Sequence, residues 1–252
     1  MGAAWWLLPP AVFLAGWQAL AARGALNPLF FPAPSVLAGA CVEMLKSGEL
    51  GAQVGATLLR MLLGSVLGAV AGLACGLSMG AVGAIRRSLE PFISALNSTP
   101  KLVLLPMLML FTGVGETARI VPVALTSFVI LAMHALDAVR GVNQAYVELA
   151  RNYGAGRSAL VRRVYLPASL PGIFTGLRLA VGRSLVITVS IELVGARNGL
   201  GSMIWMAWQT FATEKLYIGV IATATLGALF HRGLQALEAR LIPWGSRAER
   251  AA

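Results

Sequence analysis

The stretch Met61–Ile85, MLLGSVLGAVAGLACGLSMGAVGAI, contains no charged residue and has a glycine at every fourth position. A run of roughly 20 apolar residues is enough for a helix to cross a bilayer. Residues four apart share one helix face, so the glycines form a strip that another helix backbone can approach closely. We expect a membrane helix from about Val54 to Ala84 and a close helix contact, moving or static, at Gly64, Gly68, Gly72, Gly76 and Gly80.

The composition of the whole chain indicates a membrane protein. Of 252 residues, 58% are hydrophobic and 12% are charged, whereas soluble domains carry about 25% charged residues. The formal net charge of +10 is not arranged like that of a nucleic-acid-binding protein, because the positive residues lie in short gaps between apolar runs. The sequence therefore predicts an all-α integral membrane protein with about six transmembrane helices. The expected spans are Trp5–Ala22 with Trp6 near one interface, Val54–Ala84, a broken element after Glu90, Ile120–Leu136, Leu170–Val194 and Ile218–His231.

Local signals refine these boundaries. Pro100 and Pro106 are both expected to interrupt the element after Glu90. Ser35 is expected to be the N-cap of a short amphipathic helix that ends at Ser47-Gly48. In this layout, 14 of the 20 Lys and Arg residues fall at the cytoplasmic side or at the adjoining helix ends, which agrees with the positive-inside rule. They are Arg86, Arg87, Lys101, Arg140, Arg151, Arg157, Arg162, Arg163, Arg178, Arg183, Arg232, Arg240, Arg247 and Arg250.

Few residues of the chain are suited to catalysis or to binding a metal or a cofactor. Cys41 and Cys75 lack a CxxC partner, and no nucleotide-binding, HExxH or paired-carboxylate motif is present. We expect no catalytic residue, no metal site and no cofactor bound by this chain. His134 and Asp137 are three apart on one helix, which fits either a proton relay or an ordinary histidine at a helix end.

Charges within the fifth span are more informative, because charges in a membrane helix usually face protein or water. Arg178 is expected to reach the cytoplasmic headgroups, and Arg183 and Thr188 are candidates for a solute pathway.

The segment Arg140–Pro167, RGVNQAYVELARNYGAGRSALVRRVYLP, is a basic island between apolar runs. Its order of Glu148-Leu149-Ala150, then Gly154-Ala155, then Val164-Tyr165-Leu166-Pro167 resembles the EAA loop of permease subunits of binding-protein-dependent ABC importers. The stretch from Pro100-Lys101 to Phe111-Thr112-Gly113-Val114-Gly115-Glu116 is similar to the nitrate, taurine and aliphatic-sulfonate branch of that family.

The resemblance implies a transmembrane domain of the type I ABC importer fold, in a bacterial cytoplasmic (inner) membrane. It implies that the loop couples to a cytoplasmic ABC ATPase dimer, which binds the ATP and Mg, and that Gly154 permits a sharp turn. The coupling residues would be Glu148, Ala150, Gly154, Ala155, Gly156, Arg157, Ser158, Leu166 and Pro167. The Glu192, Gly199 and Gly201 segment would be a gate. The other partners would be a second copy of the chain and a periplasmic or lipid-anchored solute-binding protein.

The chain would form a single permease domain, residues 1–252. Residues 1–53 would hold the first span and an external amphipathic segment, residues 54–139 spans two to four, residues 140–168 the coupling loop, and residues 169–252 spans five and six with a basic tail. The expected function is the pathway of an ATP-driven importer for a small organic or inorganic anion such as a sulfonate, taurine or nitrate. The rival function is a self-sufficient secondary transporter, which would need a midplane acid or base of its own.

Overall fold

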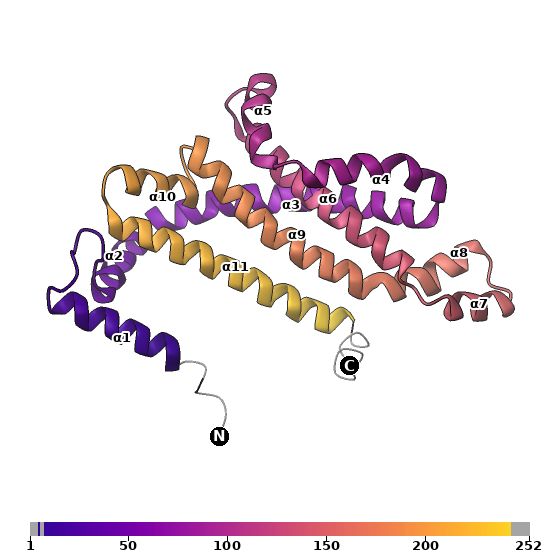
Figure 1. The fold of residues 1–252 in the computed structure, drawn as a ribbon, viewed down its shortest axis with the longest axis horizontal. Coiled ribbons are helices and arrows are strands. Elements are labelled where there is room, and N and C mark those ends of the chain that lie inside the picture. Colours follow the sequence, from indigo (N-terminus) through magenta and orange to yellow (C-terminus); the bar gives the residue numbers. More distant parts are fainter. Residues whose placement is uncertain (1–4, 6–7, 243–252) are drawn as a thin grey trace. The chain divides into compact units, whose positions relative to one another are not determined.

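A computed structural model describes residue 5 and residues 8–242, and all regular elements in this part of the chain are helical (Figure 1). The prediction of an all-α protein is confirmed for these residues. Trp6 and the expected basic tail with Arg247 and Arg250 lie outside them. The helices are α1 (Leu8–Ala22), α2 (Pro34–Lys46), α3 (Glu49–Ala81), α4 (Gly83–Ser98), α5 (Leu104–Thr112), α6 (Glu116–Arg140), α7 (Gln144–Asn152), α8 (Arg157–Leu160), α9 (Leu166–Gly195), α10 (Leu200–Gln209) and α11 (Thr213–Leu241), with a 3₁₀ turn η2 (Lys101–Val103) and a π-helical turn η3 (Val161–Tyr165).

Two described helices, α3 and α6, are long and apolar enough to cross a membrane. The count rises to four if Gly83–Ser98 with Lys101–Thr112, and Ser158–Gly195 with Leu200–Gln209, each form one broken span. The shorter apolar helix α1 has 15 residues. The expectation of about six spans therefore stays a prediction, while the membrane-spanning character of the chain rests on α3 and α6.

The chain divides into two compact units, and α3, α9 and α11 each contribute residues to both. Unit 1 consists of Met1–Leu58 and Glu192–Thr225, and unit 2 of Leu59–Ile191 and Leu226–Ala252.

In unit 2, α6 contributes to three buried clusters, and it packs closely against α3. A Cβ atom added at Gly64 would lie 2.7 Å from the Cβ of Val123, and one added at Gly68 would overlap the carbonyl oxygen of Ala124. An added Cβ atom would likewise overlap atoms of Phe128 at Gly72, of Ala132 at Gly76 and of Val139 at Gly80. The five glycines thus allow the two backbones to come so close that alanine would not fit, which maximises van der Waals contact between helices. Two more glycines that the sequence did not single out, Gly172 and Gly176 of α9, approach Ala138 and His134 of α6 in the same way.

The expected break after Glu90 occurs at Pro100 only. Thr99 takes an extended conformation, as a residue before proline must, and α4 and the following helix are bent by 84°. The expectation that Pro106 also breaks the helix is wrong. Pro106 lies in the first turn of α5, where the backbone N–H groups have no partner within the helix and proline removes nothing.

In unit 1, Ser35 is not the N-cap of α2 as expected. Ala33 occupies that position and Pro34 is the first helical residue, a place that the fixed φ of proline favours. Ser35 instead binds α1: its backbone N–H donates to Gln18 Oε1 at 3.1 Å, and Gln18 Nε2 donates to Ser35 Oγ at 3.2 Å.

Candidate functional site

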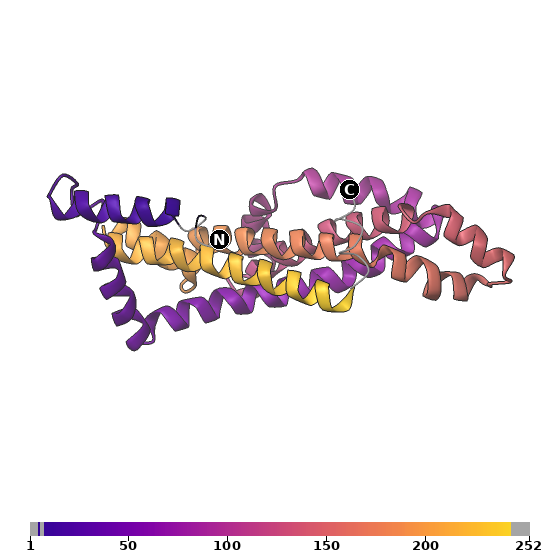
Figure 2. The same ribbon diagram turned by 90° about the horizontal axis from the view of Figure 1, so that it is seen from below.

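The basic island folds into a small hairpin of two helices, α7 and α8, at the end of unit 2 (Figures 1 and 2). Asn143 caps α7 by accepting a hydrogen bond from the backbone N–H of Ala145 at 2.9 Å. Val142, Val147 and Leu160 are buried together and form a core of their own. Ala150, Ala155, Val164 and Tyr165 pack around it. This buried core therefore stabilises the hairpin.

The other side of α7 and its C-terminal turn is apolar but exposed. Tyr146 and Leu149 are more than half exposed, and Tyr153 is 85% exposed. Their spacing of three and four residues places them on one side of the helix, away from the buried Val147. An exposed group of large apolar side chains on a locally stabilised element is typical of an interaction surface.

Gly154 makes the turn between α7 and α8. Its φ is +79°, and its N–H donates to the carbonyl oxygen of Arg151, while the N–H of Ala155 donates to that of Ala150. A glycine in the left-handed region is the usual way to end a helix. The other coupling residues follow the expected order: Glu148 is exposed on α7, Gly156 precedes α8, Arg157 and Ser158 begin it, and Leu166 and Pro167 begin α9.

A cavity of about 510 Å³ lies within unit 2 at the break between α4 and α5. Its cationic and histidine side chains are Lys101, Arg183 and His134. Asn97, Ser98, Thr99, Thr126 and Ser190 supply its other polar groups, and no acidic residue lines it. Of the two residues predicted to line a pathway, the structure brings Arg183 into this cavity and leaves Thr188 outside. Thr188 is buried, and its hydroxyl donates to the carbonyl oxygen of Ser184 at 2.7 Å.

Arg178 has a partner that the sequence did not indicate. Its guanidinium forms an ion pair with Glu238 of α11 at 3.0 Å and donates to the hydroxyl of Thr175 at 3.3 Å. Its expected place at the cytoplasmic headgroups stays a prediction.

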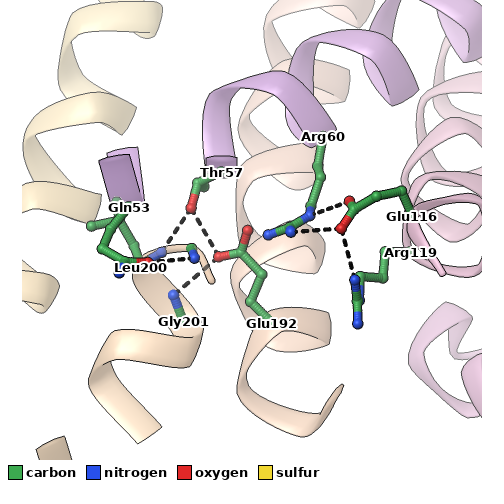
Figure 3. Close-up of polar contacts among 9 residues, drawn as sticks. Gln53, Thr57, Arg60, Glu116, Arg119, Glu192, Leu200 and Gly201 are labelled. Carbon is green, nitrogen blue, oxygen red and sulfur yellow. Dashed lines mark hydrogen bonds and ion pairs between the residues drawn. The ribbon is translucent and has the colours of Figure 1, made fainter. Parts of the chain in front are cut away.

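In unit 1, Glu192 holds the start of α10 (Figure 3). The Glu192 side chain is 1% exposed, and its Oε2 accepts hydrogen bonds from the hydroxyl of Thr57 at 2.9 Å and from the N–H of Gly201 at 3.0 Å. The N–H of Leu200 donates to Thr57 Oγ1 at 2.8 Å, and that of Gly199 to Gln53 Oε1 at 2.6 Å. A carboxylate at a helix N-terminus compensates both the unpaired N–H groups and the positive end of the helix dipole.

Only glycine fits at position 199 in this cluster. Its φ is +112°, and an added Cβ would overlap the carboxylate of Glu192. Glu192, Gly199 and Gly201, predicted together as a gate, are thus in direct contact, and Thr57 and Gln53 complete the cluster. We call these five residues with Leu200 the Glu192 cluster.

Unit 2 contains an ion-pair cluster that the sequence did not reveal (Figure 3). The Arg60 guanidinium, 2% exposed, forms two hydrogen bonds with the carboxylate of Glu116, from Nε at 2.6 Å and from Nη2 at 2.9 Å. Arg119 Nη1 donates to the same carboxylate at 2.7 Å. Two features of the sequence could have indicated this cluster. Glu116 and Arg119 are three residues apart, and the expected topology places both residues and Arg60 at the external ends of their helices.

Among the residues that the structure describes, no group of three His, Cys, Asp or Glu is placed to hold a metal ion.

The fold and these sites define a class: helical membrane domains that carry a small protruding helical hairpin. The structure resembles the methionine ABC transporter MetNI in an inward-facing conformation, with a TM-score of 0.67 and 20% identity over 75% of this chain and 94% of that one. It also resembles an amino acid ABC transporter solved with histidines, with a TM-score of 0.63 and 20% identity over 79% and 97% of the two chains. The fold is that of type I ABC importer transmembrane domains.

The chain belongs to the family of binding-protein-dependent transport system inner membrane components, whose profile matches residues 64–243. It is 34% identical over 239 residues to the taurine transport system permease protein TauC of Escherichia coli, covering 93% of this chain and 87% of TauC. It is 32% identical over 238 residues to a putative aliphatic sulfonates transport permease protein SsuC of Bacillus subtilis, covering 94% and 86% of the two chains.

The protein is therefore an integral membrane permease subunit of an ABC importer, and it is not an enzyme. Permeases of this family work with an ATPase and a binding protein, so the rival function of a self-sufficient secondary transporter is set aside.

Proposed function

We propose that the chain forms the translocation pathway for a small organic or inorganic anion, such as a sulfonate, taurine or nitrate, across the bacterial cytoplasmic membrane. In this proposal, residues 140–168 couple the pathway to a cytoplasmic ATPase dimer that binds ATP and Mg. A second copy of the chain completes the pathway, and a periplasmic or lipid-anchored binding protein delivers the solute. Residues 1–252 act as one permease domain, with residues 1–53, 54–139 and 169–252 contributing its spans.

The exposed side of α7 carries the coupling part of the proposal. Tyr146, Leu149 and Tyr153 are exposed, although Val147 on the other side of the same helix is fully buried. Large aromatic side chains are the residues that most often dominate binding energy at protein interfaces. The hairpin core keeps this surface rigid, so motion of a bound partner would be transmitted to α6 and α9, the two helices that the hairpin joins.

The substrate class rests on charge and on relatives. TauC and SsuC are named for taurine and aliphatic sulfonates, which carry a sulfonate anion. Arg183 lies within a long apolar helix and lines a cavity without an acidic residue. A charge in that position is expected to mark a substrate pathway. The Glu192 cluster, which fixes the start of α10, is proposed as part of the gate.

Affinity purification from native membranes tests the coupling surface. The tagged chain, solubilised in mild detergent, should recover an ATPase in stoichiometric amount, and the Gly154→Asp variant should recover none. Gly113→Asp is the matched control, because Gly113 has a φ of +78°, close to the +79° of Gly154, and both lie in open space. With φ +78° and ψ 174°, Gly113 lies in a region essentially restricted to glycine, so aspartate there strains the backbone outside the hairpin, whereas only the Gly154 variant changes the hairpin.

Loss of the ATPase from both variants would mean that strain alone explains the effect, and recovery with both would exclude the hairpin as the coupling surface. Co-expression of two differently tagged copies tests the dimer: each tag should recover the other from the same membranes, and separate recovery would contradict it.

A further inference from the structure

We infer that the cavity of unit 2 is a binding site for organosulfonates, with Lys101 and Arg183 holding the sulfonate and an adjoining apolar wall holding the carbon chain. The inference rests on the proposed anion-import function and extends it, because it assigns substrate recognition to this chain as well as to a binding protein.

The position of Arg183 is the first observation that supports this site. At about 1.5 Å of rise per residue, it lies roughly 18 Å from the end of α9 at Gly195 and roughly 25 Å from its start at Leu166. Among the described residues, no carboxylate lies within ion-pair distance of its guanidinium, and its side chain is exposed. By contrast, Arg178 of the same helix is paired with Glu238. A cation left without a counter-ion in the middle of a membrane helix is suited to bind a mobile anion.

Lys101 is the second reason. It belongs to the 3₁₀ turn η2 that follows the break at Pro100, and its ammonium donates to the carbonyl oxygen of Asn97 at 2.9 Å. An ammonium has three donors, so two remain for another acceptor. Because the chain bends at Pro100, the end of α4 and Lys101 line the same cavity as Arg183.

The hydroxyl groups around the cavity cannot serve as the main donors. Each of the four hydroxyls donates to the carbonyl oxygen four residues earlier: Ser98 to Ser94, Thr99 to Ala95, Thr126 to Pro122 and Ser190 to Val186. A hydroxyl has one proton, so these oxygens face the cavity as acceptors. Recognition of an anion therefore depends on the two cations, with His134 and the amide of Asn97 as further polar groups.

The apolar wall selects among anions. Ile130, Leu179, Val186 and Ile187 line the same cavity. An inorganic anion such as nitrate would leave this wall in contact with water, whereas a short alkyl chain would cover it and gain hydrophobic free energy. A cavity of about 510 Å³ falls within the usual range for small-molecule sites, which is about 300–1,000 Å³.

A thiol reporter tests the site without a measurement of transport. In a Cys41→Ser, Cys75→Ala background, Ser190→Cys adds a thiol to the cavity wall, and the full chain is probed in native membrane vesicles. Two methanethiosulfonate reagents are compared, one with a sulfonatoethyl group and one with a trimethylammonioethyl group. Thr210→Cys is the control, since Thr210 is exposed and does not line the cavity.

The anionic reagent should react faster than the cationic one at the cavity position, by a ratio about tenfold or more above that of the Thr210→Cys control, because a charged cleft concentrates counter-ions. Adding Arg183→Gln should abolish this preference, Lys101→Gln should reduce it, and Arg183→Lys should retain it. Ethanesulfonate should slow the reaction more than nitrate does, and choline should not slow it.

A ratio equal to that of the control, or a ratio unchanged by Arg183→Gln, would overturn the inference. Ser98→Cys provides a second reporter on the cavity wall. If neither reporter reacts with either reagent, the cavity does not admit a sulfonate of this size, and the inference also fails.

Uptake by proteoliposomes that contain the ATPase and binding protein separates this inference from the proposed function. Wild-type protein that takes up no sulfonate, taurine or nitrate would contradict the proposed function. Sulfonate uptake by the wild type that Arg183→Gln leaves unchanged in KM would contradict only the assignment of this cavity.

Discussion

Gly154 and Gly199 both end a turn with a positive φ, yet their surroundings are opposite. Around Gly154, no atom outside its immediate chain neighbours lies within 4 Å of where a Cβ would be, and the preceding Tyr153 is exposed. Around Gly199, the same construction overlaps the carboxylate of Glu192, and the neighbouring N–H groups all have partners within unit 1. The first turn adjoins large side chains that are exposed in the single chain, and the second belongs to a cluster whose N–H groups are paired within unit 1.

The difference separates two uses of glycine in one permease. At Gly199, glycine makes room for a buried carboxylate, so its replacement should damage folding. At Gly154, glycine permits a positive φ in open space, so under the proposed coupling function its replacement should damage assembly more than folding. The predictions below follow the expected loss of stability, from the largest to the smallest.

Gly199→Ala should give the largest loss. At φ +112° and ψ 162°, Gly199 has a backbone conformation essentially restricted to glycine, which costs about 1–3 kcal/mol for a residue with a Cβ, and forced overpacking adds about 1–3 kcal/mol. Thermal unfolding of the purified protein in detergent, followed by tryptophan fluorescence, measures the change. Gly113→Ala isolates the backbone term, because Gly113 has positive φ and open surroundings. Equal unfolding temperatures for the two variants would show that the overlap with Glu192 has no cost.

Glu192→Gln should lower stability by about 1–3 kcal/mol, since a buried, hydrogen-bonded charge at a helix N-terminus is replaced by an amide that also brings two donors. The same unfolding assay applies. Glu43→Gln changes an exposed glutamate and should have almost no effect. If the Glu192 variant unfolds at the temperature of the Glu43 variant, the carboxylate does not hold α10.

Gly154→Ala should cost about 1–2 kcal/mol, from backbone strain alone. Gly156→Ala is the neighbouring control, with open surroundings and no positive φ, and it should stay within about 0.5 kcal/mol of wild type. A loss at Gly154 as large as that at Gly199 would mean that the two turns do not differ as described.

Tyr153→Ala should change stability by less than about 0.5 kcal/mol, because its side chain is 85% exposed. It should nevertheless reduce the recovery of the ATPase in the affinity purification. Gln144→Ala, at an exposed position on another side of α7, should leave that recovery unchanged. Full recovery with Tyr153→Ala would remove this side chain from the coupling surface.

Much of this protein could be predicted from local patterns. The charge-free run with glycine at every fourth residue predicted the close contact of α3, and the resemblance of the basic island to the EAA loop implied a sharp turn at Gly154. Both depend on residues near in sequence, where periodicity and turn chemistry act directly. The same reasoning failed at Pro106 and Ser35, because a proline is harmless in a first turn and a neighbouring proline took the start of α2.

The candidate sites were only half predictable. Arg183 was identified because a charge in an apolar helix is costly, and Glu192, Gly199 and Gly201 were identified as a motif. Lys101, His134 and the ion-pair cluster of Arg60, Glu116 and Arg119 were not assigned to sites, since their members come from different helices. Thr188 was placed in the pathway, but its helix turns it into the interior.

Apolar runs, the placement of charges and the EAA-like motif are patterns within one chain, and they were enough to assign the protein to its class. The side chains that meet across helices became known only from the folded arrangement. It paired Arg178 with Glu238, gave Arg183 no carboxylate partner among the described residues, and placed Lys101 in the lining of the same cavity as Arg183. The physical reason is that helix packing fixes these juxtapositions, and the partner of each helix face is not encoded by spacing within that helix.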